Sequence, residues 1–451
     1  MTKKTVAALI LSALLILSLA LLHPLGMSAR QGFTLGLLVS VILLWATGSV
    51  DQTAASLALL AGFLLFSGVA PRTVLTFPLS ENFLLIAVTF LFSQGILNSG
   101  LAQRLLEPFL SRFASTAPRL LLAMVLCSFV TALFVPQSIS RTLIVASLFS
   151  GYLERSGTPA AARSALMFGL FFTGILVGLL FPRGDIVLNY SLLSISGADL
   201  GDTQWVACLA PPTLCVLALS SLLFLLLFRR ELKDYRPAPR PAERPAPLTG
   251  RERRDLALIA ATVLLWALEP LHGVSGTAIV CLGTALMFPL GLLGRGDWKA
   301  LDLRVLVFLT AAFSIGGVIP ASGLAQLLFG GLGALLPAAF SWRYALVILL
   351  CTMGMHMVLG SNVTSLAVAI PILTAVSGGQ APHLVVLLLI YVAVSQHFLL
   401  PFHHVTLAVG VGKGCFTGGQ VLRFGLPMTL LVPACGLTLY LGWWHILGLW
   451  A

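Results

Sequence analysis

The chain has 451 residues, of which 58% are hydrophobic and 9% are charged, whereas an ordinary soluble domain carries about 25% charged residues. With a mean hydropathy of +1.02, this composition excludes a water-soluble globular protein and a disordered chain. The net charge of +11 is spread over short segments without a basic, aromatic-interleaved stripe, so we expect no nucleic-acid partner. We expect a polytopic, all-α membrane protein in contact with a lipid bilayer.

Apolar runs long enough to cross a bilayer predict about 11 transmembrane helices. The first half is predicted to contain spans at 5–22, 34–50, 53–70, 82–100, 118–152 (a hairpin), 164–181 and 205–228. The second half is predicted to contain spans at 255–271, 275–292, 303–320, 343–376 (a hairpin), 384–400 and 421–447. Between them, the proline-rich motif RPAPRPAERPAP predicts an extended linker, because proline at alternating positions prevents a helix.

Short motifs recur in the same order in both halves of the chain. The pairs are LLWA at 43–46 and 264–267, SGLAQ at 99–103 and 322–326, and PQSIS at 136–140 opposite SNVTS at 361–365. An odd number of spans separates the repeat starts, so the repeats are predicted to be inverted, as in secondary transporters. We therefore divide the chain into an extra N-terminal helix (1–33), a first repeat (34–228), a linker (229–254) and a second repeat (255–451).

The distribution of Lys and Arg predicts the orientation. Most of these residues fall on the side that holds the N-terminus and the 229–254 linker, and few fall on the opposite side. The positive-inside rule then places the N-terminus and the linker in the cytoplasm and the C-terminus outside. We expect a multi-pass protein of the inner (cytoplasmic) membrane.

Four interruptions are predicted at membrane depth, in two symmetry-related pairs. Re-entrant hairpins are predicted to break at 136–138 and 360–362, and discontinuous helices at 182–185 and 401–404. Irregular backbone at this depth survives where it lines a cavity or is buried in protein. Half-helix N-termini favour anions and half-helix C-termini favour small cations, which predicts an anionic substrate carried with a cation.

The second half contains SNVTSLAVAIPIL (361–373), LPFHHVTLAVGVGKG (400–414) and RFGLPMTLL (423–431). These segments resemble the divalent anion–sodium symporters of the ion transporter superfamily. The resemblance implies a dicarboxylate, citrate or sulfate substrate, sodium as the coupling ion beside each hairpin tip, an elevator-type movement and a homodimer. The family's Ser-Asn-Thr tip is matched by Ser361 and Asn362, whereas Val363 stands in place of the threonine.

The breaks and the resemblance together nominate the candidate site, with no metal beyond sodium and no cofactor. The candidate substrate-binding residues are Gln137, Ser138, Arg141, Ser361, Asn362, His403, His404 and Thr406. The candidate cation-binding residues are Gly360, Asn362 and Gln137.

Three charged residues and one histidine each have a specific interpretation. Arg141 could be a tethered cation that replaces one sodium or meets the substrate, or it could pair structurally with Asp185 or a backbone carbonyl. Arg183 is predicted to form a local ion pair with Asp185. His356 is predicted to be a packing residue of the second hairpin.

Other functions remain as alternatives to a sodium-coupled anion transporter. A sodium-independent exchanger or exporter of organic anions or oxyanions is supported by Arg141 and by Gln137, which stands in place of asparagine. A passive channel is disfavoured by the paired breaks. A membrane-embedded enzyme would need a metal-binding or nucleophilic cluster such as HExxH, and an ATP-driven pump would need GxxxxGK[ST]; neither motif is present, so we expect no enzyme.

Overall fold

In a computed structural model, residues 3–47, 49–101, 104, 114–235, 237, 247–324, 327 and 336–450 are described. Throughout these ranges the regular structure is helical, with no strand. Most of the proline-rich motif at 236–247, and parts of both SGLAQ motifs, lie outside them. The predicted extended linker (229–254) is helical at both of its ends, at 229–232 and from 250 onward.

The helices of the first half follow one another in the predicted order. They are α1 (Lys3–Leu22), α2 (Ala29–Thr47), α3 (Gln52–Phe66), α4 (Pro71–Val74), α5 (Glu81–Ser99), α7 (Ala117–Phe134), α8 (Ser138–Arg155), α9 (Ala160–Gly178), α10 (Ile186–Ser196), α11 (Asp202–Leu227) and α12 (Arg229–Leu232).

The second half contains a similar series. It comprises α13 (Gly250–Ala267), α14 (Glu269–His272), α15 (Gly276–Met287), α16 (Leu303–Ala321), α18 (Trp342–Leu359), α19 (Asn362–Ser377), α20 (His383–Gln396), α21 (Val405–Gly412), α22 (Gly418–Cys435), a π-helical turn (Gly436–Tyr440) and α23 (Leu441–Ile446).

Length and hydropathy make many of these helices fit a bilayer. Within the described ranges, 7 helices are long and apolar enough to span one, and five shorter apolar helices accompany them, among them α19 and α20. Two of the shorter helices, α19 and α20, lie next to the predicted breaks of the second half. The prediction of a polytopic, all-helical membrane protein is confirmed.

Both predicted hairpins are present, and each turns at the predicted residues. α7 ends at Phe134 and α8 begins at Ser138, with Pro136 between them, where proline supplies no N–H to continue the helix. α18 ends at Gly360, which has a φ of 65°, a left-handed conformation that glycine adopts without steric cost. The turns place 136–138 and 360–362 at the ends of their hairpins.

The two helices that follow the hairpins are discontinuous. After α9, a 3-10 turn at Pro182–Asp185 precedes α10, and after α20 a similar turn at Pro401–His403 precedes α21. α9 ends at Gly178 and α20 ends at Gln396, and the residue before each proline is extended, as a following proline favours. Both breaks lie inside the protein, since α9 and α20 are among its most buried helices.

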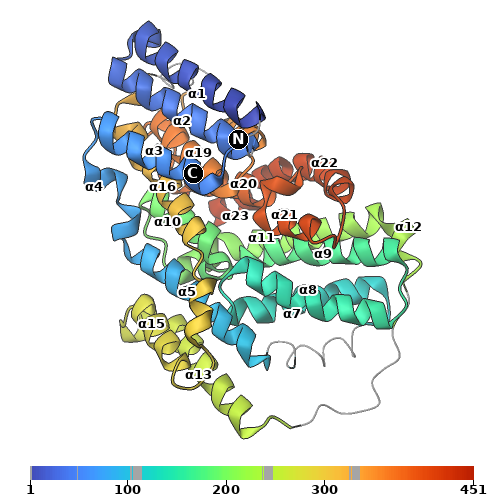
Figure 1. The fold of residues 1–451 in the computed structure, drawn as a ribbon. Coiled ribbons are helices and arrows are strands. Elements are labelled where there is room, and N and C mark those ends of the chain that lie inside the picture. The colour runs from blue at the N-terminus through green and yellow to red at the C-terminus, as the bar shows by residue number, and fades with distance from the viewer. Residues whose placement is uncertain are drawn as a thin grey trace.

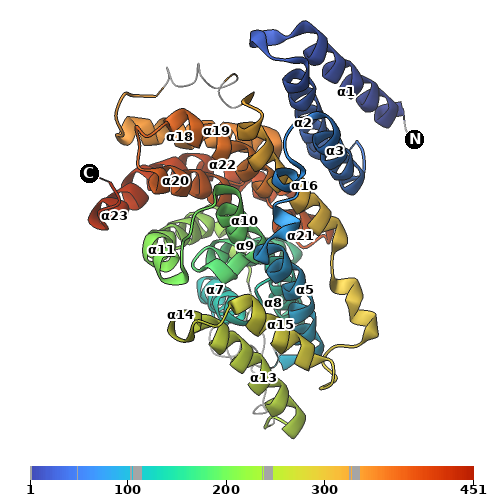
Figure 2. The same cartoon turned by 90° about the vertical axis from the view of Figure 1, so that its left-hand side faces the viewer.

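The hairpins and discontinuous helices form the centre of the molecule. Figure 1 shows α7, α8, α9 and α11 side by side, and Figure 2 shows α18, α19, α20 and α22 as the neighbouring layer. Helices α9, α11 and α22 meet in a cluster of aromatic rings made of Phe168, Phe172, Phe224, Phe228, Phe416 and Phe424. Helices α1–α3 and the pair α13 and α15 lie at opposite ends of the views.

A buried hydrogen-bond brace joins the first break to the middle of α20. The Asn189 amide nitrogen lies 2.9 Å from the Gly178 carbonyl oxygen and 3.1 Å from those of Phe181 and Pro182. The Tyr391 hydroxyl of α20 donates to the Asn189 side-chain oxygen at 2.6 Å. Carbonyls that the break removes from the helical pattern are thereby satisfied, which a buried break requires.

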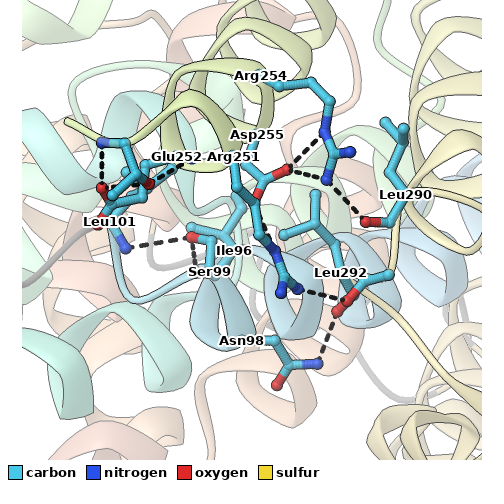
Figure 3. A network of polar contacts seen from close by, with 12 residues as sticks. Ile96, Asn98, Ser99, Leu101, Arg251, Glu252, Arg254, Asp255, Leu290 and Leu292 are labelled. Carbon is cyan, nitrogen blue, oxygen red and sulfur yellow. Dashed lines mark hydrogen bonds and ion pairs between the residues drawn. The ribbon is translucent and has the colours of Figure 1, made fainter.

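Polar contacts fasten α5, α13 and α15 at the end near the linker (Figure 3). Arg254 contacts the Asp255 carboxylate at 3.1 Å and donates to the Leu290 carbonyl oxygen at 3.0 Å. Asn98 of α5 donates to the Leu292 carbonyl oxygen at 2.8 Å. These side chains satisfy carbonyls at the end of α15, which no longer have helical partners.

Candidate functional site

A cavity of about 460 Å³ lies between the two hairpin tips. Seven of the nominated residues line it: Gln137, Ser138, Gly360, Ser361, Asn362, His404 and Thr406. Its other walls come from α2, α3 and α16, with Gln52 and Asp302 at the starts of α3 and α16. The cavity therefore extends from the tips toward the N-terminal ends of α3 and α16.

At the first tip, polar side chains cap the helices that begin there. The Gln137 side-chain oxygen accepts hydrogen bonds from the Ser140 backbone N–H at 2.9 Å and from the Ser140 hydroxyl. Asp185 caps α10 by accepting from the Leu188 N–H at 3.2 Å. The half-helix N-termini of the first half are therefore neutralised by the chain's own side chains, one of them an acid.

At the second tip, the two corresponding helices start without such caps. Ser361 precedes α19 and His404 precedes α21, and neither side chain accepts from the helix that follows it. Exposed N–H groups at a helix start carry a partial positive charge that attracts anions. The electrostatics of the cavity are thus asymmetric, with the donors for an anion concentrated on the second half.

Asn362 is the nominated residue at this tip whose side-chain oxygen lacks a hydrogen-bond partner among the described residues. Its side chain is buried, at 8% exposure. A buried amide oxygen without a partner costs about 1–3 kcal/mol, which a bound ion or substrate would recover. The neighbouring Thr364 hydroxyl is likewise buried without a hydrogen-bond partner among the described residues.

Arg141 lies behind the first tip and does not line the cavity. It is 1% exposed, and it donates to the carbonyl oxygens of Gly184 and of Val135, the latter at 3.3 Å. Its other terminal nitrogen is 3.4 Å from the Ser138 hydroxyl, and the Asp185 carboxylate acts on it electrostatically. The guanidinium therefore occupies a cage of oxygen atoms between the tip and the break, which is the environment of a bound small cation.

The predicted ion pair between Arg183 and Asp185 is wrong. Arg183 pairs instead with Asp202 at 2.5 Å and with Glu269 at 3.7 Å, donates to the Trp266 carbonyl oxygen at 2.8 Å, and lies 4.5 Å from the centre of the Trp266 ring. The turn directs Arg183 outward toward α11 and α13–α14, while Asp185 turns inward to cap α10. Proximity in sequence did not translate into a contact.

Replacing Arg183 with methionine is expected to lower the free energy of unfolding by about 1–3 kcal/mol, because the Trp266 carbonyl and two carboxylates lose their partner. Thermal unfolding in detergent micelles measures the effect. The matched control is Arg343→Met, which removes an exposed arginine that lies over the Trp342 ring at 5.3 Å without a carboxylate. Equal shifts for both variants would contradict the structural role of the Arg183 contacts.

The two adjacent histidines of the second break, His403 and His404, lie in different environments. His404 lines the cavity, whereas His403 lies beneath it in a buried cluster with His356 and His397. His356, predicted to be a packing residue, is fully buried and hydrogen-bonded on both ring nitrogens. His397 ends α20 and was not nominated from the sequence.

The cavity also contains residues that sequence reasoning missed. Asp185, Trp45, Gln52, Phe308 and Asp302 all line it. Asp185 was named from the sequence only as a partner for Arg141 or Arg183. The other four lie on unbroken helices or at their starts, where no irregularity in the sequence distinguishes them from ordinary membrane-facing or capping residues.

Two helical hairpins and two discontinuous helices around one cavity are the arrangement of a membrane transporter. The chain belongs to the family described as the sodium:sulfate symporter transmembrane region, whose profile matches residues 2–450. It is therefore a multi-pass membrane transporter and not an enzyme.

Individual relatives agree with this assignment. The chain is 23% identical to a membrane protein of Cupriavidus necator, covering 97% of this chain and 91% of the relative. It is 23% identical to dicarboxylate transporter 1, chloroplastic, of Spinacia oleracea, covering 81% and 68%. The crystal structure of the Alcanivorax borkumensis YdaH transporter shares the fold, with a TM-score of 0.54 and 16% identity over 83% of this chain and 88% of that one.

Proposed function

We propose that the protein is a secondary active transporter of small anions, either di- or tricarboxylates or sulfate, coupled to sodium. The observation that carries this proposal is the pair of uncapped helix starts, α19 and α21, which meet at one cavity beside the unpartnered Asn362 oxygen. The helix starts suit an anion, and the amide oxygen suits a small cation. Membership in a sodium:sulfate symporter family and the similarity to dicarboxylate transporters support the same substrates.

In this proposal the anion binds Ser361, Asn362, Thr406 and His404, with Gln137 and Ser138 closing the opposite wall. Sodium binds at the Gly360 carbonyl and the Asn362 side chain. Arg141 takes the corresponding place at the first tip, where its guanidinium already meets two carbonyls, so a single sodium accompanies each anion. Gln137, whose oxygen caps α8, then serves as a structural residue rather than a cation ligand.

The hairpins and discontinuous helices move together past α2, α3 and α16 in an elevator-type cycle, and the present cavity corresponds to the state open toward the linker. The halves 34–228 and 255–451 act as inverted repeats, with 1–33 as an added helix and 229–254 as a linker. The protein functions as a homodimer in the cytoplasmic membrane. The N-terminus and linker face the cytoplasm and the C-terminus faces outward, as the Lys and Arg distribution indicates.

Uptake of radiolabelled succinate, citrate and sulfate into proteoliposomes tests the proposal. An inward sodium gradient is expected to raise uptake of at least one of these anions by about tenfold over a choline gradient, since one coupled sodium adds its gradient to the driving force. Vesicles without protein provide the background. Transport of none of the three anions would contradict the proposed substrate class.

A second candidate is a sodium-independent anion exchanger. It is favoured by Arg141, which supplies a permanent positive charge where a sodium ion would otherwise bind. In the same vesicles, uptake that requires unlabelled anion inside and ignores sodium would establish exchange in place of symport.

A further inference from the structure

Three imidazole rings lie together beneath the second hairpin tip. His356 comes from α18, His397 from the end of α20, and His403 from the break before α21. All three are fully buried, their ring centres are 4.9–5.9 Å apart, and their ligand-capable nitrogens lie within 4.8 Å of one another. Such a cluster could hold a metal ion or a proton, and the hydrogen-bond partners distinguish the two.

The partners of His397 fix its tautomer. Its Nε2 lies 3.1 Å from the Thr429 hydroxyl, and that hydroxyl donates its own hydrogen to the Gly425 carbonyl oxygen at 2.9 Å. While the Thr429 hydrogen stays on the Gly425 carbonyl, His397 donates from Nε2. Its Nδ1 keeps a lone pair and has no hydrogen-bond partner among the described residues.

The partners of His403 fix the opposite arrangement. Its Nδ1 accepts from the backbone N–H groups of Leu399 at 3.2 Å and Leu400 at 3.5 Å. The hydrogen of the neutral ring is consequently on Nε2. A metal ion would need a lone pair from every ring, and the backbone donors at His403 oppose this, so the cluster is better suited to a proton.

His356 is the ring in which both nitrogens face an oxygen that can accept a hydrogen bond, so its contacts suit the protonated imidazole. Its Nδ1 is 2.8 Å from the Ser365 hydroxyl and its Nε2 is 3.1 Å from the His397 carbonyl oxygen. The same Ser365 oxygen is 2.7 Å from the Ser361 carbonyl oxygen. In the neutral ring, Nε2–H donates to His397 and Nδ1 accepts from Ser365. In the protonated ring, Nδ1–H donates to Ser365, whose hydrogen turns to Ser361.

Every hydrogen on His356 thus has an acceptor in both states, without movement of a heavy atom. The switch ends at the carbonyl of Ser361, which lines the anion cavity. Burial disfavours a charged imidazole, whereas two hydrogen-bond acceptors and a nearby anion favour it. An anion in the cavity would therefore supply the stabilisation that the empty protein lacks.

We propose that His356 takes up one proton when an anion binds in the cavity, and that Ser365 transmits this change to the second hairpin tip. The inference rests on the proposed function, because the anion offsets the new charge. The proton adds to the lone pair of His356 Nδ1 and comes from water; no other covalent bond is broken. Transport of the anion would then carry a proton with it.

The surroundings of His356 contain no competing acid. Within the described ranges, the titratable groups that act on it are His397, His403 and His404. Three other ionisable side chains on the elements packed against α18 have partners of their own: Tyr391 with Asn189, Tyr440 with Thr213, and Arg423 with Glu231. Two more lie at helix starts, Arg30 in α2 and His383 in α20.

Proton uptake on anion binding tests the proposal. Purified full-length protein in weakly buffered detergent solution is mixed with succinate, citrate or sulfate at pH 8, above the range in which these anions titrate, and a pH indicator records the protons removed. Wild type is expected to take up about one proton for each anion bound, measured by parallel equilibrium dialysis. His356→Gln is expected to take up none, and Ser365→Ala to take up less than wild type.

The exposed His272→Gln variant is the matched control, because it removes a histidine outside the cluster, and it should behave as wild type. The wild-type stoichiometry needs no variant, so a folding defect in His356→Gln would not obscure it. Anion binding without proton uptake would overturn the proton site and leave the proposed function intact. Binding of none of the three anions would overturn both. If the wild type bound one cobalt(II) ion and His397→Gln bound none, the cluster would be a metal site and the proton proposal would be wrong.

Discussion

Asn362→Ala is expected to reduce sodium-stimulated anion uptake by about 10–100-fold, because Asn362 lines the cavity and its buried side-chain oxygen has no hydrogen-bond partner among the described residues. A hydrogen bond or ion contact to a charged group contributes about 1.5–3 kcal/mol, which corresponds to this range. Initial uptake rates in proteoliposomes at saturating sodium measure it, followed by a sodium titration to separate weaker ion binding from slower transport.

The control for this variant is Asn98→Ala. Asn98 donates to the Leu292 carbonyl at the linker end of α15, outside the cavity (Figure 3), so its loss should change uptake by less than about threefold. If Asn362→Ala transported as well as Asn98→Ala, with the same sodium dependence, the tip would not be the ion site.

Arg141→Gln is expected to lower uptake at least tenfold and to destabilise the protein by about 3–5 kcal/mol, the usual effect of removing one member of a buried charged group. The carbonyl oxygens of Gly184 and Val135 would lose their donor, and Asp185 would lose the positive charge that acts on it. Thermal unfolding and uptake are measured together. Arg141→Lys, which keeps the charge but not the planar fork, should retain part of both properties.

Arg119→Gln provides the control, since Arg119 lies at the exposed start of α7 in the same hairpin. A sodium titration adds a sharper criterion. If Arg141 replaces a sodium ion, a smaller side chain opens its oxygen cage, and residual transport by Arg141→Ala should show a steeper sodium dependence than wild type. Normal stability, uptake and sodium dependence in Arg141→Gln would contradict the tethered-cation role.

Much of the fold follows from local sequence features. Apolar runs identify the helices, and Pro136, Pro401 and Gly360 mark three interruptions because proline lacks an N–H and glycine adopts positive φ. The predicted internal repeat pairs the tips, and seven of the nine nominated residues line one cavity. These inferences need only chain direction and spacing.

The remaining features depend on how distant segments approach one another. His356 and His397 belong to different helices, and no spacing rule joins them, so their contact appears only in the fold. Arg183 has partners on α11 and α14 rather than its neighbour Asp185, because the turn directs the two side chains apart. Asp302 caps a helix in sequence terms, and only the packing of α16 brings it to the cavity.

The Asn189–Tyr391 brace makes the two discontinuous helices mechanically one piece, since α9–α10 and α20 share a buried hydrogen-bond centre. In the proposed elevator cycle, a cargo held between the breaks would keep its coordination shell, and the moving contact would be the surface between this piece and α16. Turnover would then depend on how smoothly Val305 and Phe308, which face the cavity from α16, pass the tips. Lipids and temperature would affect speed at that surface more than they affect selectivity.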